Sequence, residues 1–598
     1  MILPRYVPYV PGTEKHRFQI EMECIRKKAK RVLIVTAPTG AGKTYAISAL
    51  TKNARGPFSG KVLITAPTNA LATQICRDLL DMPDPPYVTT WAASEFESNG
   101  PRRIIEMINQ AQTNDVIVSN PDLIHLLTTN FYARTNVPQK HRTFEDVLAR
   151  LEIHVFDEYH AYDERMMASV IAYMLKARQM PACRHHRYIF MSATPRAELP
   201  SILSRFGFEY EVIEEGETEC NETGSRQVKG ALVVEFTDSP VEEILDSELP
   251  SPGQGFPRTL VVFDSFVGQE RALWHLISRG YRRDADGDIV AMTGRDTKSE
   301  EGQEEWSRAP IIMATSKADL GLNIDGLDKL IMEPGWATSQ FWQRFGRAGR
   351  GRDANVIISI PPGLGQLLSG PMNDGIKGID DIITHITKRQ DFSDNRVQDY
   401  VGFYLAATEH LTRKAGLLDT IREISLPSRA AQARGLMRKI QFMPENEYSG
   451  SREARARALT ERVIRSVCWL RGQALEVDCT YSRPDRPMTL KENILFILSQ
   501  TENQYRDGIY VVTGFKDKPI DAMVSYKGLA SNVSITVPHG KPNWTTWSKF
   551  VDKLVNSMKT LTNDGEAGEW LKAFEEVLRR LTPDTLPPLE VAADDQFI

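Results

Sequence analysis

The feature that most constrains this 598-residue chain is an apolar run followed at once by a glycine-rich loop and a helix-forming segment. Val32-Leu33-Ile34-Val35 predicts a buried strand, and Ala37 to Thr44, Ala-Pro-Thr-Gly-Ala-Gly-Lys-Thr, follows it. Gly40 and Gly42 let the backbone bend and aim its N–H groups inward, and a helix that begins near Lys43 adds the positive end of its dipole. This order predicts a cradle for a triphosphate, with ATP as the expected ligand.

Two side chains of this loop have expected roles. Lys43 is expected to contact the β- and γ-phosphates, and Thr44 to contact Mg²⁺. The first position is Ala37 instead of Gly, but that position tolerates a small side chain where the strand ends. An accidental Gly-Lys-Thr turn is the alternative for the loop considered alone. The predicted nucleotide-binding residues of the loop are Thr39, Gly40, Ala41, Gly42, Lys43 and Thr44.

Length and composition are typical of a soluble multidomain protein. The length predicts about three or four domains. With 73 basic and 78 acidic side chains the net charge is −5, so nucleic acid could bind only through local basic surfaces. The six cysteines form no CxxC pair, which argues against a zinc ribbon and an iron–sulfur cluster and favours reduced thiols in the cytoplasm. No signal peptide and no run of eighteen apolar residues is present, so secretion and membrane spanning are not expected.

Short apolar runs alternate with helix-like stretches in two parts of the chain, which predicts two parallel α/β sheets. The Pro- and Gly-rich segment 250–255 is the expected boundary between them. The strands expected in the first sheet are 32–35, 62–65, 116–118, 154–156 and 188–191, and those of the second are 260–263, 289–292, 311–314, 330–332 and 356–360.

From about residue 391 the pattern changes to helices with a few strands. Eleven Lys/Arg and five Asp/Glu between Arg422 and Arg471 favour equally a DNA-channel wall and a solvated amphipathic helix. Trp544 and Trp547 could stack on bases, but packing at a helix start is favoured. The pair His185-His186 is expected on a surface loop. The expected helices are 397–418, 453–470, 547–561 and 568–581, and the expected strands are 509–513 and 533–537.

A pair of carboxylates follows the strand expected at 153–156. The strand and the upstream loop place Asp157 and Glu158 at the sheet edge where open α/β sheets bind ligands, although an isolated Asp-Glu pair is usually a solvated loop. Asp157 would hold hydrated Mg²⁺, and Glu158 would orient and polarise the attacking water.

The second half contains Gln343-Arg344-Phe345-Gly346-Arg347-Ala348-Gly349-Arg350. Arg347 and Arg350 lie three residues apart, so both can point toward one target on a helical turn. Guanidinium groups suit the charge on a γ-phosphate during transfer. A basic surface turn that contacts nucleic acid or solvent is the alternative.

Together these motifs resemble the superfamily-2 helicases of the DExH type, over roughly residues 15–355. The resemblance implies that Gln19 reads adenine and that Gln343, Arg347, Arg350, Lys43, Asp157 and Glu158 act in catalysis. It implies further nucleotide contacts at Gly321 and Asn323, where many relatives have Gly-x-Asp. Expected nucleic-acid contacts are Thr65, Pro67, Thr68, Ser119, Asn120, Ser265, Gly294, Arg295 and Thr315, and expected coupling residues are His160, Ser192 and Thr194.

The implied fold is α/β, with two tandem RecA-like parallel-sheet domains of the P-loop NTPase class and a mainly helical C-terminal region with a few strands. The expected divisions are 1–220 for the ATP-binding domain, 221–255 for a linker, 256–390 for the second RecA-like domain, 391–581 for an accessory domain and 582–598 for a flexible tail.

Residues 156–163 and 191–195 look most like the helicase subunit of type I CRISPR interference, particularly the type I-D form. Many such helicases carry a preceding HD nuclease, but Lys43 lies near the start of this sequence and none of the eleven histidines is followed by Asp. The resemblance implies an antiviral motor that moves 3′-to-5′ on single-stranded DNA. Its expected partners are a guide-RNA surveillance complex and a separate large subunit with the HD nuclease.

Two other functions are compatible with the motifs. One is a DExH helicase that acts on RNA or in DNA repair. The other is an ATP-sensing scaffold without turnover, which predicts damage to Glu158 or Arg350, and both residues are intact.

Overall fold

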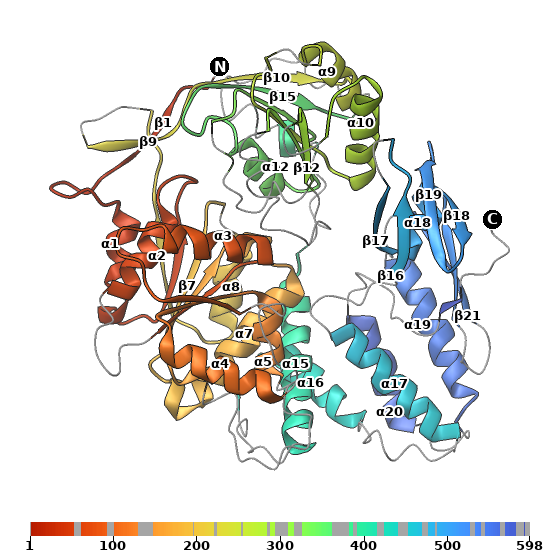
Figure 1. Ribbon diagram of the computed structural model, residues 1–598. Coiled ribbons are helices and arrows are strands. Elements are labelled where there is room, and N and C mark those ends of the chain that lie inside the picture. The colour runs from red at the N-terminus through yellow and green to blue at the C-terminus, as the bar shows by residue number, and fades with distance from the viewer. Residues whose placement is uncertain are drawn as a thin grey trace.

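The computed structural model describes residues 2–52, 61–91, 101–129, 147–194, 196–219, 224–252, 255–283, 287–292, 309–315, 324, 326–361, 379, 382–384, 386, 392–414, 424–440, 452–468, 476–484, 487–526, 533–539, 544–562, 568–581 and 591–592. Figure 1 shows two α/β lobes and a C-terminal region of helices and small sheets beside them. Among these residues no helix combines the length and the apolar character that a membrane crossing needs.

The first lobe is a seven-stranded parallel sheet in the order β4-β5-β3-β6-β7-β2-β8. Alternate residues of its strands are buried against opposite layers, so that Leu33 and Val35 face a core with α1, α2 and α3 while Val32 and Ile34 face the other core. The strands are β2 (Val32–Thr36), β3 (Lys61–Thr65), β4 (Val88–Trp91), β5 (Val116–Ser119), β6 (Leu151–Asp157), β7 (Arg187–Ser192) and β8 (Tyr210–Glu214). The helices are α1 (Arg17–Glu23), α2 (Lys43–Lys52), α3 (Asn69–Leu80), α4 (Pro101–Thr113), α5 (Pro121–Thr128), α7 (Glu164–Gln179) and α8 (Glu198–Arg205).

The second lobe is a six-stranded parallel sheet in the order β10-β15-β14-β11-β13-β12. One face packs against α9 and α10, and the other packs against α12. The strands are β10 (Leu232–Thr237), β11 (Thr259–Val262), β12 (Ile289–Met292), β13 (Ile311–Ala314), β14 (Lys329–Met332) and β15 (Ala354–Ser359), and the helices are α9 (Val241–Glu248), α10 (Phe266–Ser278) and α12 (Thr338–Phe345). The two parallel sheets confirm the predicted fold class.

The segment 221–255 is not a plain linker. Strand β9 (Ser225–Lys229) pairs antiparallel with β1 (Arg5–Pro8), and these two strands form a ribbon outside both large sheets. The next strand, β10, is an edge strand of the second sheet. The second lobe therefore begins at β10, upstream of the Pro/Gly segment that the sequence suggested as the boundary.

The C-terminal region contains helices around two small sheets. Its helices are α15 (Asp394–Lys414), α16 (Ser428–Lys439), α17 (Arg452–Cys468), α18 (Ile494–Gln500), α19 (Trp544–Lys559) and α20 (Gly568–Arg580). Its sheets have the orders β17-β16-β19-β18 and β21-β20-β22, with β16 (Glu476–Tyr481), β17 (Met488–Asn493), β18 (Thr501–Arg506), β19 (Ile509–Phe515), β20 (Ala522–Tyr526), β21 (Val533–Val537) and β22 (Val591–Ala592). Because β22 pairs with β20, part of the segment expected to be a loose tail is strand.

This region is attached to both lobes. Helix α15 packs against the first lobe, where Arg396 forms an ion pair with Glu164 at 2.6 Å. The mixed sheet packs against α10 of the second lobe, where Arg483 and Glu270 form an ion pair whose side chains are 2% and 0% exposed. Figure 1 shows α15 beside α7 and the sheet of β16 to β19 on the side of α10.

Several side chains of uncertain role are now placed. Trp547 is buried and donates from Nε1 to the Leu578 carbonyl at 2.8 Å, as packing predicts, whereas Trp544 is exposed with the guanidinium of Arg396 5.6 Å from its ring centre. His186 is buried and bonds through Nε2 to the Leu148 carbonyl at 3.0 Å, so the expectation of a surface loop was wrong for this residue. On α17, Arg452, Arg455 and Arg462 are exposed, and Arg465 forms an ion pair with Glu461.

Candidate active site

The glycine-rich loop lies at the carboxyl end of β2 and runs directly into α2. Gly40 and Gly42 have φ of 84° and 85°, which side chains with a Cβ adopt only with strain, so glycine is required at both positions. Ala37, the departure from the strict pattern, is fully buried, and its N–H donates to the Ser192 carbonyl at 3.0 Å. The loop has the geometry that the sequence predicted.

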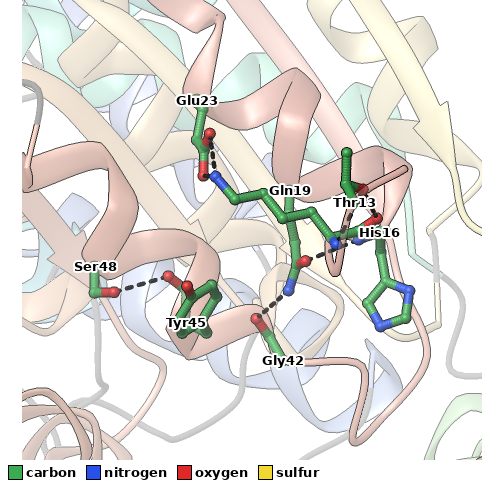
Figure 2. Close-up of polar contacts among 8 residues, drawn as sticks. Thr13, His16, Gln19, Glu23, Gly42, Tyr45 and Ser48 are labelled. Atoms are coloured by element: carbon green, nitrogen blue, oxygen red, sulfur yellow. Dashed lines mark hydrogen bonds and ion pairs between the residues drawn. The ribbon is translucent and has the colours of Figure 1, made fainter. Parts of the chain in front are cut away.

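Gln19 holds this loop from α1, as Figure 2 shows. Its Oε1 accepts from the N–H of His16 at 2.9 Å, and its Nε2 donates to the Gly42 carbonyl at 3.3 Å. The side chain is 4% exposed, and its amide is hydrogen-bonded to the first turn of α1 and to the loop. The recognition of adenine by Gln19 stays a prediction.

Glu158 follows β6 in a left-handed conformation, with φ 46° and ψ 43°. Its Oε1 lies 3.0 Å from Nζ of Lys43, and its Oε2 lies 3.3 Å from Nδ1 of His160. Burial alone would raise the pKa of Glu158, but the charges of Lys43, His160 and Arg347 outweigh it and lower the pKa to about 2. The carboxylate is therefore ionised at neutral pH.

Asp157 is buried beside Glu158. Burial, with a further contribution from the charge of Glu158, raises its pKa to about 7. Its Oδ1 has no hydrogen-bond partner among the described residues. A buried carboxylate oxygen without a partner fits a hydrated divalent cation, which would also be held by the hydroxyl of Thr44 and by phosphate oxygens. No group of three or more His, Cys, Asp or Glu suited to a metal occurs in the described part of the chain.

His160 links these acids to β7. Its Nδ1 lies 2.6 Å from Oγ of Ser192, and this hydroxyl donates to the Thr194 carbonyl at 2.7 Å. Because the single proton of Ser192 is used there, the Nδ1–H of His160 donates to Ser192. Burial lowers the pKa of His160 to about 4, so the ring is neutral at pH 7.

The arginine motif lies at the end of α12, against the loop of the first lobe. A Cβ on Gly346 would lie 3.8 Å from Oγ1 of Thr39. Arg347 is 3% exposed, and Nε of Arg350 donates to the Gly346 carbonyl at 3.1 Å. Arg344 has a different role, because it forms an ion pair with Asp264 and fixes the loop after β11.

These groups line one cavity of about 780 Å³ between the two lobes. It contains, as predicted, Thr39, Gly40, Gly42, Lys43, Thr44, Asp157, Glu158, His160, Gln343, Arg347 and Arg350. Sequence reasoning missed the part of the lining formed by Leu71, Gln74, Ile75, Asp78, Ala193, Arg226, Gln227, Val228, Gly326, Gly351 and Arg352. On α3 the four missed residues recur at helical spacing and could have been found as one face of that helix.

Three expected nucleic-acid contacts begin helices at the carboxyl ends of strands. The side chains of Thr68, Asn120 and Ser265 accept from backbone N–H groups of α3, α5 and α10. Thr65, Ser119 and Thr315 are buried, and Pro67 precedes Thr68 in the same loop. Gly294, Arg295, Gly321 and Asn323 lie outside the described residues. The roles of all these residues stay predictions.

Comparison with known families agrees with the geometry of the cavity. The sequence of residues 19–202 matches the DEAD/DEAH box helicase family. These residues are therefore similar to a DEAD/DEAH box helicase domain. With the arginine motif of the second lobe across the cavity, this domain makes the chain an ATPase of the helicase type.

Solved helicase structures share the fold. The DUF1998 helicase MrfA bound to DNA and AMPPNP superposes with a TM-score of 0.55 at 14% identity, over 88% of this chain and 74% of that one. MrfA bound to DNA gives 0.52 at 14% identity, over 88% and 75%. The Mycobacterium smegmatis helicase Lhr bound to ssDNA and AMP-PNP gives 0.47 at 16% identity, over 94% and 71%. No curated protein matches the sequence.

Proposed function

We propose that this chain is an ATP-driven translocase or helicase that moves 3′-to-5′ on single-stranded DNA in the cytoplasm. The observation that carries the proposal is the cavity in which Lys43 and Glu158 of one lobe face Arg347 and Arg350 of the other. A nucleotide bound there touches both lobes, so binding and hydrolysis bias how the lobes sit against each other.

The ion pair of Lys43 and Glu158 describes the site before ATP binds. When ATP binds, its phosphates compete with Glu158 for Lys43. Once Lys43 contacts the phosphates, the Glu158 carboxylate is released to orient and polarise the attacking water. His160 keeps that carboxylate in place through its bond to Ser192. Arg347 and Arg350 neutralise the charge on the transferred group. Mg²⁺ held by Thr44 and Asp157 would supply charge stabilisation for the phosphates.

DNA is the nucleic acid that we favour. Two structures of one helicase of the same fold, MrfA, are described as bound to DNA. In this chain the loops after β3, β5 and β11 carry Thr68, Asn120 and Ser265 at helix starts, and such loops grip a backbone without reading sequence. Beside the last loop, Trp336 is 58% exposed with Nε1 3.4 Å from the Asp264 carbonyl, and its ring could stack on a base.

The proposed process is type I CRISPR interference, of the type I-D form. It is supported by the resemblance of residues 156–163 and 191–195 and by the lack of any His-Asp pair in the sequence. The nuclease activity would then belong to a separate HD-bearing large subunit, and a guide-RNA surveillance complex would recruit the motor. A DExH helicase that acts on RNA or in DNA repair is the alternative.

The test compares ATP hydrolysis with poly-dT and poly-U and then measures strand displacement on substrates with 3′ or 5′ single-stranded tails. We expect stimulation by DNA and activity from the 3′ tail. Equal or greater stimulation by RNA would overturn the assignment to DNA. A CRISPR array with an HD-bearing subunit among the neighbouring genes is the expected context, and its absence would favour the alternative.

A further inference from the structure

The ribbon of β1 and β9 joins the two lobes beside the cavity. Its two strands pair antiparallel and belong to neither parallel sheet. Upstream of β1, Ile2 exchanges backbone hydrogen bonds of 2.8 and 3.0 Å with Leu232 and packs in the core of the second lobe. Val7 of β1 packs in the core of the first lobe. The N-terminal segment is therefore anchored in both hydrophobic cores. Figure 1 shows β1 and β9 at the edge of the molecule.

Strand β9 also contacts both phosphate-facing loops. At one end the N–H of Gly230 donates to the Gly349 carbonyl at 2.7 Å, within the arginine motif. The contact is close, because a Cβ on Gly230 would lie 2.5 Å from the Arg352 carbonyl oxygen. Two residues earlier in the chain, the carbonyl oxygen of Val228 lies 3.7 Å from the position that a Cβ on Gly40 would occupy. The ribbon thus forms a third wall of the cavity.

Arg226 is the cation that this wall presents. Its side chain lines the cavity, and its Nη1 lies 3.6 Å from the position that a Cβ on Gly42 would occupy. Within the described part of the chain no ion pair or hydrogen bond is found for the Arg226 guanidinium, which is exposed, whereas Lys43 is paired with Glu158.

We propose that Arg226 is a nucleotide-binding residue that contacts the α- and β-phosphates of ATP at the glycine-rich loop. A guanidinium fork binds phosphate oxygens bidentately, and it adds side-chain donors to a cradle otherwise built from backbone N–H groups. The inference rests on the proposed nucleotide cleft and adds a contact that neither parallel sheet supplies.

The position of Arg226 argues against a contact with the γ-phosphate. Lys43, His160 and Arg347 all lower the pKa of Glu158, and Arg226 is not among the groups that do so. At the glycine-rich loop, Nη1 of Arg226 and Nε2 of Gln19 lie 3.6 and 3.1 Å from the position that a Cβ on Gly42 would occupy. We therefore assign Arg226 to the phosphates that ATP and ADP share.

The experiment measures ATP and ADP affinity with a fluorescent nucleotide, and kcat and KM for ATP with single-stranded DNA, in the full chain. Arg226→Ala is expected to raise the Kd for ATP and for ADP by similar factors of about tenfold or more, with kcat changed less than about twofold. Arg226→Lys should fall between wild type and Arg226→Ala, since it keeps the charge without the fork. The matched control is Arg17→Ala, because Arg17 is exposed on α1 and is absent from the cavity lining.

Unchanged affinity in Arg226→Ala, or a loss for ATP alone, would overturn this assignment. Lys43→Ala distinguishes a failure of the proposed nucleotide cleft from a failure of the role of Arg226. If Lys43→Ala hydrolyses ATP like wild type, the proposed cleft itself is wrong. If Lys43→Ala is inactive and Arg226→Ala binds nucleotide normally, only the role of Arg226 is wrong. Melting temperatures of all variants identify any that lose the fold.

Discussion

Glu158 combines an unusual backbone conformation with close contacts to Lys43 and His160. A left-handed conformation costs a non-glycine residue on the order of 1 kcal/mol, and it persists only where the surroundings fix it. Here the conformation turns the carboxylate between Lys43 and His160. The strain is explained by this position, because a residue continuing β6 would point away from the glycine-rich loop.

Glu158→Gln is expected to lower kcat at least about a hundredfold, since positioned general bases contribute about that much. It should bind ATP at least as tightly as wild type, because Lys43 loses its ion-pair partner and is available to the phosphates. Phosphate release and nucleotide affinity, each measured with single-stranded DNA, check the two parts. Equal kcat in the variant and wild type would refute the mechanism and favour an ATP-sensing scaffold without turnover.

His186 and His154 predict an acid-sensitive first lobe. Their rings lie 4.4 Å apart, and burial lowers the pKa of His186 to about 3 and that of His154 well below its usual value. Between the lowered pKa and about pH 6.5 the unfolded chain binds protons that the native chain does not, so stability falls as pH falls. His186 alone accounts for a loss of about 2 kcal/mol between pH 7 and pH 5.

Thermal unfolding at pH 7 and pH 5 tests this. His186→Asn should show a smaller pH-dependent decrease in melting temperature than wild type. His539→Asn is the control, because this histidine is exposed and should leave the decrease unchanged. A decrease of the same size in all three proteins would contradict the prediction.

The sequence predicted the residues whose chemistry depends on local spacing. Lys43 and Glu158 follow strands directly, and Arg347 and Arg350 follow a helix, so their positions are set by short segments. Arg226 could not be found this way, since its position depends on pairing between β1 and β9 across more than two hundred residues. The burial of His186 likewise depends on its contacts with Leu148 and His154, which an isolated His-His pair does not indicate.

At the scale of elements, α15 and α16 pack at unusually close range. A Cβ on Gly402 would lie 2.3 Å from the Ala430 carbonyl oxygen and 2.9 Å from Cβ of Ala433. Gly435, on the exposed side of α16, has no heavy atom within 4 Å of its Cβ position. The first glycine permits the contact of the two helices, whereas the second only lowers helix propensity.

Gly402→Ala is expected to destabilise the protein by about 1–3 kcal/mol through overpacking. Gly435→Ala is the matched control and should be neutral or stabilising by up to about 1 kcal/mol, because alanine favours helix. Melting temperatures measured in parallel check both. Similar behaviour of the two variants would show that the close contact does not control the packing.

Elements with apolar residues on both faces were predictable, and the edge strands β12 and β21 were also predicted, whereas the edge strands β8 and β10 were missed. The interior strands β2, β3, β6 and β7 are buried runs that the sequence marks clearly. The edge strands β8 and β10 contain exposed polar residues and pair on one side only, so they lack that pattern. Helix α16 was missed because two of its four buried residues are small alanines and a third is an arginine, so it lacks a strong apolar pattern.

At the scale of the whole molecule, the buried ion pair of Arg483 and Glu270 joins the C-terminal region to the second lobe. Arg483→Met is expected to cost about 3–5 kcal/mol, because it leaves Glu270 buried without a partner. Arg483→Met with Glu270→Met should be clearly more stable than the single variant, since no unpaired charge remains. Thermal unfolding and DNA-stimulated ATP hydrolysis check this, and equal instability of both variants would contradict it.

The two lobes are joined in two separate places. The ribbon connects them beside the cavity, and the C-terminal region connects them through α15 and through the sheet of β16 to β19. Two bodies attached at two distant points can rotate about the line through those points, but they cannot slide or twist freely. Opening of the cleft is thereby restricted to essentially one rotation, so each hydrolysed nucleotide would produce a displacement of fixed direction.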